Sequence, residues 1–360
     1  MKVGMSIFPQ NPGHARPDSD ILRECLNLAD QAEDLGLDSI WSVEHHFTNY
    51  ILMPDVVQFL TYMAGRTKNI ELGTQVIVLP WHDPVRIAEQ IALLDNFCGG
   101  RLIIGFGRGA ATVEYDGFRV PMSDSRERFA EAAQIVMRAL SNESFSYEGE
   151  IFKIPEMSVR PRPLSFPMTQ FYGAAVSPAS AEGMARLGLG VMTAVPLFGW
   201  EALAKDVARY GEIQLEIGIE PVAPITQLFV YVAETEDEAF RVARQYMSEE
   251  RRSVDEHYHF SDGHLKTVKG YEHYGSLAGS ESVTSMDGVD TFMDVNIVGT
   301  PETCLDRIRQ FRDLIGFDHF IGQFSYGGMP YEIAERNLQL FASEVAPILQ
   351  REPAAVRLDA

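Results

Sequence analysis

The sequence predicts an α/β fold of the (β/α)₈ TIM barrel class. Short apolar segments alternate with longer segments of helical periodicity along almost the whole chain, and about eight such pairs occur. The apolar segments are continuous, as in parallel strands that are buried on both faces. A doubly wound open sheet, the competing architecture, normally stops at five or six strands. We therefore expect one barrel domain over residues 1–350, followed by a C-terminal tail at 351–360.

The first half of the chain contains four of these pairs. The expected strands span residues 2–8, 39–43, 70–79 and 102–107, and the expected helices span residues 18–35, 55–64, 84–97 and 125–140. Ile21, Leu22 and Cys25 follow helical spacing, and Gly36 ends that helix. Pro84 lies in the first turn of the third helix, where proline is tolerated. The segment IELGTQVIVL reads as one continuous buried strand.

The second half repeats the pattern. The expected strands span residues 169–175, 190–193, 224–232 and 317–323, and the expected helices span residues 177–187, 201–217, 236–248 and 330–349. Ser177 is a suitable N-cap and Pro178 a suitable first-turn residue, and Gly188 ends that helix. These local signals support the strand–helix alternation independently of the apolar periodicity.

Two insertions interrupt the alternation. Residues of about 142–165 contain FSYEGEIFKI, an expected hairpin that turns at Glu148 and Gly149, followed by a proline-rich connector. Residues 251–294 are rich in Gly, Ser, His and Tyr and lack clear periodicity. A long irregular insertion at this place in a barrel is typical of an active-site lid.

The composition narrows the possible partners. The net charge of −21, from 51 acidic and 30 basic residues, argues against nucleic acid or an anionic membrane surface as a partner. The three cysteines are far apart and form no CxxC motif, so neither a disulfide framework nor a zinc knot is supported. No apolar run approaches the roughly 20 residues of a membrane span, and the N-terminus does not resemble a signal peptide. We expect a cytoplasmic protein.

The stretch SVEHHFTNY, residues 42–50, follows the second expected strand. Successive side chains at a strand end point to opposite sides, so His45 and His46 are not expected to share one metal ion. Glu44 and the two histidines are compatible with polar residues that cap a strand. The C-terminal end of a barrel strand is, however, where catalytic side chains lie.

Two further motifs are compatible with an anion site. GFGRG places Arg108 between glycines after the fourth strand, where a guanidinium can bind a phosphate bidentately. VSPAS places Ser177 and Ser180 at a helix N-terminus, which offers free N–H groups and hydroxyls to an anion. A plain glycine turn and a plain helix cap are the alternative interpretations.

The remaining histidines predict no metal site. His82 is interpreted as a loop or capping residue. His257, His259, His264 and His273 lie in the second insertion at spacings that match neither helical ligand pairs nor zinc fingers. We interpret them as surface residues of a histidine-rich lid.

Taken together, several motifs resemble the bacterial luciferase-like flavin monooxygenase family. They are spread over nearly the whole chain and occur in order. The motifs are EHHFTNY, GTQVIVLPWHDPVRIAEQIALLDNFCGGR, GFGRG, VSPASAEGMARLGLG and VGTPETCLDRIRQF. The family fold is a (β/α)₈ barrel, so the resemblance and the element count imply the same architecture through separate arguments.

The resemblance implies roles for individual residues. His45 matches the active-site histidine beside the flavin, with an acid/base role or a stabilising role toward the flavin peroxide. Arg108 matches an arginine that binds the flavin phosphate. The other implied cofactor-binding positions are Ser177 and Ser180 through their hydroxyls, Val176 through its backbone, and Thr74, Gln75 and Val76 under the flavin ring, with a cis peptide bond between Gln75 and Val76.

The resemblance also implies an activity and its partners. Reduced FMN would come from a separate flavin reductase and react with O₂, and one oxygen atom would be transferred to a small organic substrate. Gly107 stands where luciferase has a reactive cysteine, so light emission and an aldehyde substrate are not supported. Hydride transfer with a deazaflavin coenzyme is the alternative, and a non-catalytic flavin-binding role is disfavoured by the intact EHH and GRG motifs.

The resemblance further implies a homodimer, because family members usually pair through helices near the second and third strands. The apolar face of Ile87, Ile91 and Leu94 could form that interface. The same face could equally pack on the barrel.

Overall fold

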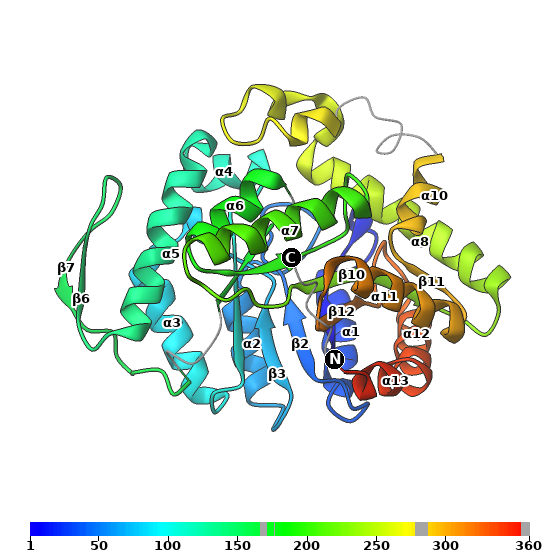
Figure 1. Ribbon diagram of the computed structural model, residues 1–360. Helices are drawn as coiled ribbons and strands as arrows, with labels where there is room; N and C mark the ends of the chain where they lie inside the picture. Colours follow the sequence, from blue (N-terminus) through cyan, green and yellow to red (C-terminus); the bar gives the residue numbers. More distant parts are fainter. Residues whose placement is uncertain (166–170, 176, 278–286, 354–360) are drawn as a thin grey trace.

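The barrel predicted from the sequence is present in the computed structural model, which describes residues 1–165, 171–175, 177–277 and 287–353. Within these ranges, parallel strands close into a ring in the order β1, β2, β3, β5, β8, β9, β10, β12, and β12 pairs back to β1 (Figure 1). The ring strands are β1 (Lys2–Ile7), β2 (Ser39–Ser42), β3 (Glu71–Thr74), β5 (Leu102–Gly107), β8 (Phe171–Ala174), β9 (Gly190–Thr193), β10 (Ile225–Val232) and β12 (His319–Gln323).

Helices follow each ring strand and cover the outside of the barrel (Figure 1). They are α1 (Asp18–Gln31), α2 (Val56–Ala64), α3 (Pro84–Phe97), α4 (Thr112–Phe118), α5 (Ser125–Ser141), α6 (Pro178–Arg186), α7 (Trp200–Glu216), α8 (Glu236–Tyr258), α10 (Asp287–Asp294), α11 (Pro301–Ile315), α12 (Tyr331–Glu344) and α13 (Ala346–Arg351). The strands are buried on both faces, and β10 is buried at every position. This burial explains why the strands read as continuous apolar runs.

Short polar side chains begin several of these helices directly after the strands. Asp55 caps α2, Asp83 caps α3, Ser177 caps α6, Thr235 caps α8 and Thr300 caps α11, each by accepting a backbone N–H of the first turn. The predicted cap at Ser177 is therefore confirmed. Because the caps lie in the loops at the C-terminal ends of the strands, they also define the rim of the barrel mouth.

Three segments differ from the predictions. Residues 70–79 do not form one strand, because β3 ends at Thr74 and a short strand, β4 (Ile77–Val78), pairs with β5 after a cis Gln75–Val76 bond. The helix predicted over residues 236–248 continues to Tyr258. Residues 297–315 had no predicted element, yet they form β11 (Ile297–Gly299) and α11.

The two insertions have different structures. The first contains the predicted hairpin, β6 (Phe145–Glu148) and β7 (Lys153–Met157), which extends away from the barrel (Figure 1). The second begins with the last turns of α8 and continues as short 3-10 turns at residues 260–262, 264–267 and 274–277. This part, yellow in Figure 1, lies over the barrel beside α4. Its role as a lid stays a prediction.

The apolar face of α3 packs on the barrel. Ile87, Ile91 and Leu94 are buried within the single chain, so this face is not available as a dimer interface. The homodimer itself stays a prediction. Among the described residues, no helix has both the length and the apolar character needed to cross a membrane.

Candidate active site

A cavity of about 680 Å³ opens at the C-terminal ends of the barrel strands. Five of the predicted site residues line it: His45, Gln75, Val76, Arg108 and Ser180. These residues come from the loops after β2, β3 and β5 and from the start of α6, so barrel closure brings together positions that are far apart in the sequence. The volume is in the range of pockets that hold a cofactor or a drug-sized ligand.

Three other predicted residues have different surroundings. Thr74 is fully buried, and its hydroxyl donates to the Gly105 carbonyl at 2.9 Å and accepts the Gly105 N–H at 2.8 Å, so it links two strands and does not line the cavity. Ser177 is buried and its hydroxyl contacts the Ser180 hydroxyl at 2.9 Å and the Ser180 N–H. Val176 lies outside the described residues.

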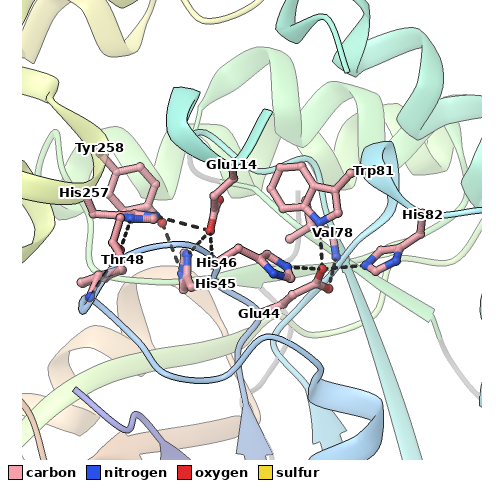
Figure 2. Close-up of polar contacts among 11 residues, drawn as sticks. Glu44, His45, His46, Thr48, Val78, Trp81, His82, Glu114, His257 and Tyr258 are labelled. Carbon is pink, nitrogen blue, oxygen red and sulfur yellow. Dashed lines mark hydrogen bonds and ion pairs between the residues drawn. The ribbon is translucent and has the colours of Figure 1, made fainter. Parts of the chain in front are cut away.

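Glu44, a buried residue beside His45 at the cavity, is the centre of a hydrogen-bond network (Figure 2). Its Oε1 accepts from Trp81 Nε1 at 2.8 Å, from His82 Nε2 at 2.6 Å and from His46 Nε2 at 3.1 Å. Its Oε2 accepts the Val78 N–H at 2.9 Å. His82 is the C-cap of a short 3-10 turn, Leu79–Trp81, so the expected loop or capping position is confirmed. Its side chain is in addition a partner of the buried Glu44 carboxylate.

The charge on Glu44 is stabilised by its donors. Burial raises the pKa of this carboxyl. The hydrogen bonds and charge of its partners, with His46 and His82 first, lower it by a larger amount, and the resulting pKa is about 2. Burial lowers the pKa of His82, whereas Glu44 raises it above its ordinary value. Glu44 thus fixes the positions of His46 and of the segment that leads into α3.

His45 belongs to a second network, centred on Glu114 of α4 (Figure 2). Glu114 Oε1 lies 3.1 Å from His45 Nδ1 and accepts the backbone N–H of His46 at 2.8 Å. His257 Nε2 lies 3.4 Å from the same oxygen, and His257 Nδ1 contacts the Thr48 hydroxyl at 2.8 Å. The two adjacent histidines therefore have different partners, as strand alternation predicted.

This network determines which nitrogen of His45 can react. Burial raises the pKa of Glu114, but the charges and hydrogen bonds of His45 and His257 lower it to about 2, so the group is an ionised acceptor at neutral pH. An ionised carboxylate can only accept, so the proton on neutral His45 lies on Nδ1. Nε2 then has a free lone pair, and it lies 3.4 Å from the Tyr258 hydroxyl at the cavity.

The interpretation of His257 as a surface residue is wrong, because it is almost completely buried. Its helix, α8, is longer than predicted, and Glu250, Val254 and His257 follow the spacing of one helical face. That spacing was the signal available in the sequence. Glu114 had no such signal, because α4 is short and was not predicted.

His45, Glu114 and His257 offer ligand atoms within 4.8 Å of one another, which is compatible with a divalent metal ion. Hydrogen bonding also accounts for this cluster, because both histidines can donate to the carboxylate. Of the other histidines in the insertion, His259 is exposed and His264 contacts the Thr112 hydroxyl at 2.9 Å. Absence of a catalytic metal stays a prediction.

Arg108 lies where the cavity meets the second insertion. Its Nη1 donates to the Gly270 carbonyl at 2.9 Å, and its guanidinium lies 3.9 Å from the centre of the Tyr271 ring. The Tyr271 hydroxyl donates to the Gly109 carbonyl at 2.7 Å. The insertion is therefore attached to the GRG motif by two hydrogen bonds, one at the Gly270 carbonyl and one at the Tyr271 hydroxyl. It covers the side of the cavity at which Arg108 lies.

The predicted cis bond between Gln75 and Val76 is confirmed. The Val76 side chain packs closely on Gly107, where an added Cβ would lie 2.1 Å from Val76 Cγ2. A larger residue at position 107 would therefore require the Val76 side chain to move.

A family model described as luciferase-like monooxygenase matches residues 1–319. The chain belongs to this family. Its members are oxidoreductases, and the predicted fold and family are confirmed. An alkanal monooxygenase alpha chain from a Kryptophanaron alfredi symbiont is 27% identical over 370 residues, which cover 98% of this chain and 99% of that protein.

Solved structures of the luciferase-like family show the same fold. Monooxygenase RslO1 from Streptomyces bottropensis has 29% identity and a TM-score of 0.82, over 97% of this chain and 99% of the other. The oxygenating constituent of 3,6-diketocamphane monooxygenase from Pseudomonas putida, in complex with FMN, has 21% identity and a TM-score of 0.70, over 96% and 98%. A secondary alcohol dehydrogenase that depends on the deazaflavin F420 has 17% identity and a TM-score of 0.72, over 98% and 99%.

Proposed function

We propose that this protein is the oxygenase component of a two-component monooxygenase. It would bind FMN that a separate reductase has reduced, and it would use O₂ to oxygenate a small organic substrate. The observation that supports this most is the single cavity that contains His45, Gln75, Val76, Arg108 and Ser180 together.

The residues present fit a flavin phosphate at one end of the cavity. Ser180 lines the cavity at the N-terminus of α6, where the helix dipole and free N–H groups favour an anion. The Arg108 guanidinium, now directed to Gly270, has further donors for a phosphate. Gln75 Oε1 is buried at the cavity and has no hydrogen-bond partner among the described residues, as expected of a group that binds a flavin ring.

Bound reduced flavin would supply the electrons that activate O₂. The protein would supply a proton-transfer group at Nε2 of His45, a residue that lines the cavity. Glu114 would keep the proton of neutral His45 on Nδ1 and would stabilise the imidazolium when Nε2 takes up a proton. The Tyr258 hydroxyl lies 3.4 Å from Nε2, and Tyr258 also lines the cavity.

The segment after α8 would exclude water from the reaction. Phe260 and Tyr274 line the cavity, and their rings stack on one another at 5.8 Å. Leu265 and Tyr271 complete this small apolar cluster. A closed apolar cover strengthens the electrostatic interactions in the cavity and limits wasteful side reactions.

The cofactor is tested by anaerobic titration of the purified protein with FMN, reduced FMN and a reduced deazaflavin, followed by oxygen consumption with a panel of organic substrates and a reductase. Tightest binding of reduced FMN and substrate-dependent oxygen uptake are expected. Preference for the deazaflavin, with hydride transfer and no oxygen uptake, would replace the proposal by the alternative activity. Binding without turnover of any substrate would favour a flavin-binding role.

Arg108→Ala is expected to weaken binding of reduced FMN by about 10- to 100-fold, because it removes charge-assisted hydrogen bonds to the phosphate. Riboflavin, which lacks the phosphate, should bind both proteins equally under the same conditions. Arg86→Ala is the matched control, since Arg86 is exposed on α3 and away from the cavity. An equal loss for FMN and riboflavin would contradict the phosphate role.

A further inference from the structure

Glu250 is a buried carboxyl group that faces the same cavity from α8. The residue has no solvent-exposed surface, and among the described residues no donor meets hydrogen-bond geometry with either carboxyl oxygen; the amide nitrogen of the neighbouring Gln10 is likewise unpaired. A carboxyl group removed from water without partners is costly, so its retention calls for a physical reason, and binding of a polar ligand group is one such reason. The proposed function does not use Glu250.

The surroundings of Glu250 leave most of its acceptor positions open. Burial raises its pKa to about 7, although the Gln10 amide and the Gly327 N–H lie near enough to lower it. The Gly327 N–H already donates to Gln10 Oε1 at 2.7 Å, and one amide cannot fill the roughly four acceptor positions of a carboxylate. The phenols that lie near enough for the charge of Glu250 to raise their pKa are those of Tyr50, Tyr258 and Tyr326.

The barrel order places Glu250 across the mouth from the phosphate end. Gln10 follows β1 and Gly327 follows β12, and these strands are neighbours in the ring. Arg108 and Ser180 follow β5 and β8, which lie on the opposite side of an eight-stranded ring. A flavin held by its phosphate at β5 and β8 would therefore extend toward the Glu250 side.

Gln227 adds a second polar group to that side. It lies on β10, the ring neighbour of β12, and it lines the cavity. Its Nε2 is buried and has no hydrogen-bond partner among the described residues. Apolar side chains also line this cavity. They are Phe8, Phe229, Val254 and Phe292.

We propose that Glu250 and Gln227 form the polar end of the substrate pocket and bind a hydroxyl group on a ring-shaped, otherwise apolar substrate. The hydroxyl donates to the Glu250 carboxylate and accepts from Gln227 Nε2, and the carbon ring rests on Phe8, Phe229 and Phe292. This inference rests on the proposed function, because it assigns the substrate class of the same cavity.

A neutral hydroxyl fits the pocket better than a cationic amine. The walls are aromatic and apolar, and desolvation of an ammonium group there is costly unless several acceptors surround it. A hydroxyl uses both the acceptor of Glu250 and the donor of Gln227, whereas an ammonium group has no use for an amide N–H. The two chemistries therefore predict different ligand preferences.

The test measures binding of three matched probes by calorimetry: thymol, a phenol; p-cymene, the same skeleton without the hydroxyl; and cuminylamine, its cationic counterpart. The wild-type protein is expected to bind thymol about 10- to 100-fold more tightly than p-cymene. Glu250→Leu should lose this preference while its affinity for p-cymene and for FMN stays unchanged, and Gln227→Leu should lose part of it.

Glu249→Leu is the matched control, because Glu249 is partly exposed beside Arg252 and does not line the cavity. The wild-type preference for thymol should increase between about pH 6 and about pH 8, since an ionised acceptor makes the stronger hydrogen bond, and Glu250→Gln should show no such increase. A retained preference in Glu250→Leu, or tighter binding of cuminylamine than of thymol, would overturn the inference.

The outcome is separable from that of the proposed function. If FMN binds but the probes show no hydroxyl preference, the substrate assignment fails alone. If FMN does not bind, the proposed function fails, and the hydroxyl preference can still be measured on the protein without flavin.

Discussion

Replacement of His45 by asparagine is expected to lower kcat for substrate oxygenation by about 100- to 10,000-fold, the range of a general acid/base group. Asparagine retains hydrogen bonding but cannot take up or deliver a proton. Glu114 holds Nδ1 of His45, so the lost function is that of Nε2, which lies 3.4 Å from the Tyr258 hydroxyl. The measurement is the steady-state rate with reduced FMN, O₂ and a substrate found in the panel described above.

Two further readouts separate a chemical role of His45 from a structural one. The affinity for reduced FMN should change by less than about threefold, because an interaction made only during the reaction does not alter ground-state binding. Added imidazole should restore part of the rate. His14→Asn is the control, since His14 is exposed and has a positive φ of 51° that asparagine tolerates. Unchanged turnover in His45→Asn would refute the assignment.

Replacement of Glu44 by glutamine is expected to reduce the free energy of unfolding by about 3 kcal/mol or more. Four donors converge on the carboxylate, and the new amide would direct N–H groups at some of them. Buried donors then lose their acceptor, which has a larger effect than loss of an exposed ion pair. Urea unfolding at neutral pH measures the change.

The pH dependence of stability has a definite sign for Glu44. Its pKa is about 2 in the folded protein and 4.5 in the unfolded reference, so its contribution is present above about pH 4.5 and is lost as the pH falls toward 2. The free energy of unfolding of Glu44→Gln should therefore decrease less than that of the wild type on acidification. Glu148→Gln, at an exposed hairpin position, should behave like the wild type. Equal acid sensitivity of Glu44→Gln and the wild type would contradict the role of this carboxylate.

Local patterns predicted much of the barrel. The strands were recognisable because parallel strands are buried on both faces, and the start of α6 was recognisable because Ser177 and Pro178 follow capping rules. Patterns of this kind depend only on neighbouring residues. They failed at residues 70–79, where continuous apolar sequence contains the break between β3 and β4.

Local sequence patterns did not predict which distant residues contact His45 and its neighbours. Strand alternation separated His45 from His46, but it could not identify Glu114, which is 69 residues away, or His257, which reaches Thr48 across 209 residues. It also did not show that Glu250 faces the cavity, because α8 continues beyond the predicted helix.

The sequence by itself determined the barrel class, the family and the motifs at the strand ends, because strand burial, helix capping and motif order are local properties of the chain. The tertiary structure decided which of those groups share a cavity and which are buried behind it. Barrel closure sets these contacts, since it places the ends of β1, β2, β5 and β12 around one opening whatever their separation in the sequence. His45 and Glu250 therefore line one cavity, although 205 residues separate them in the sequence.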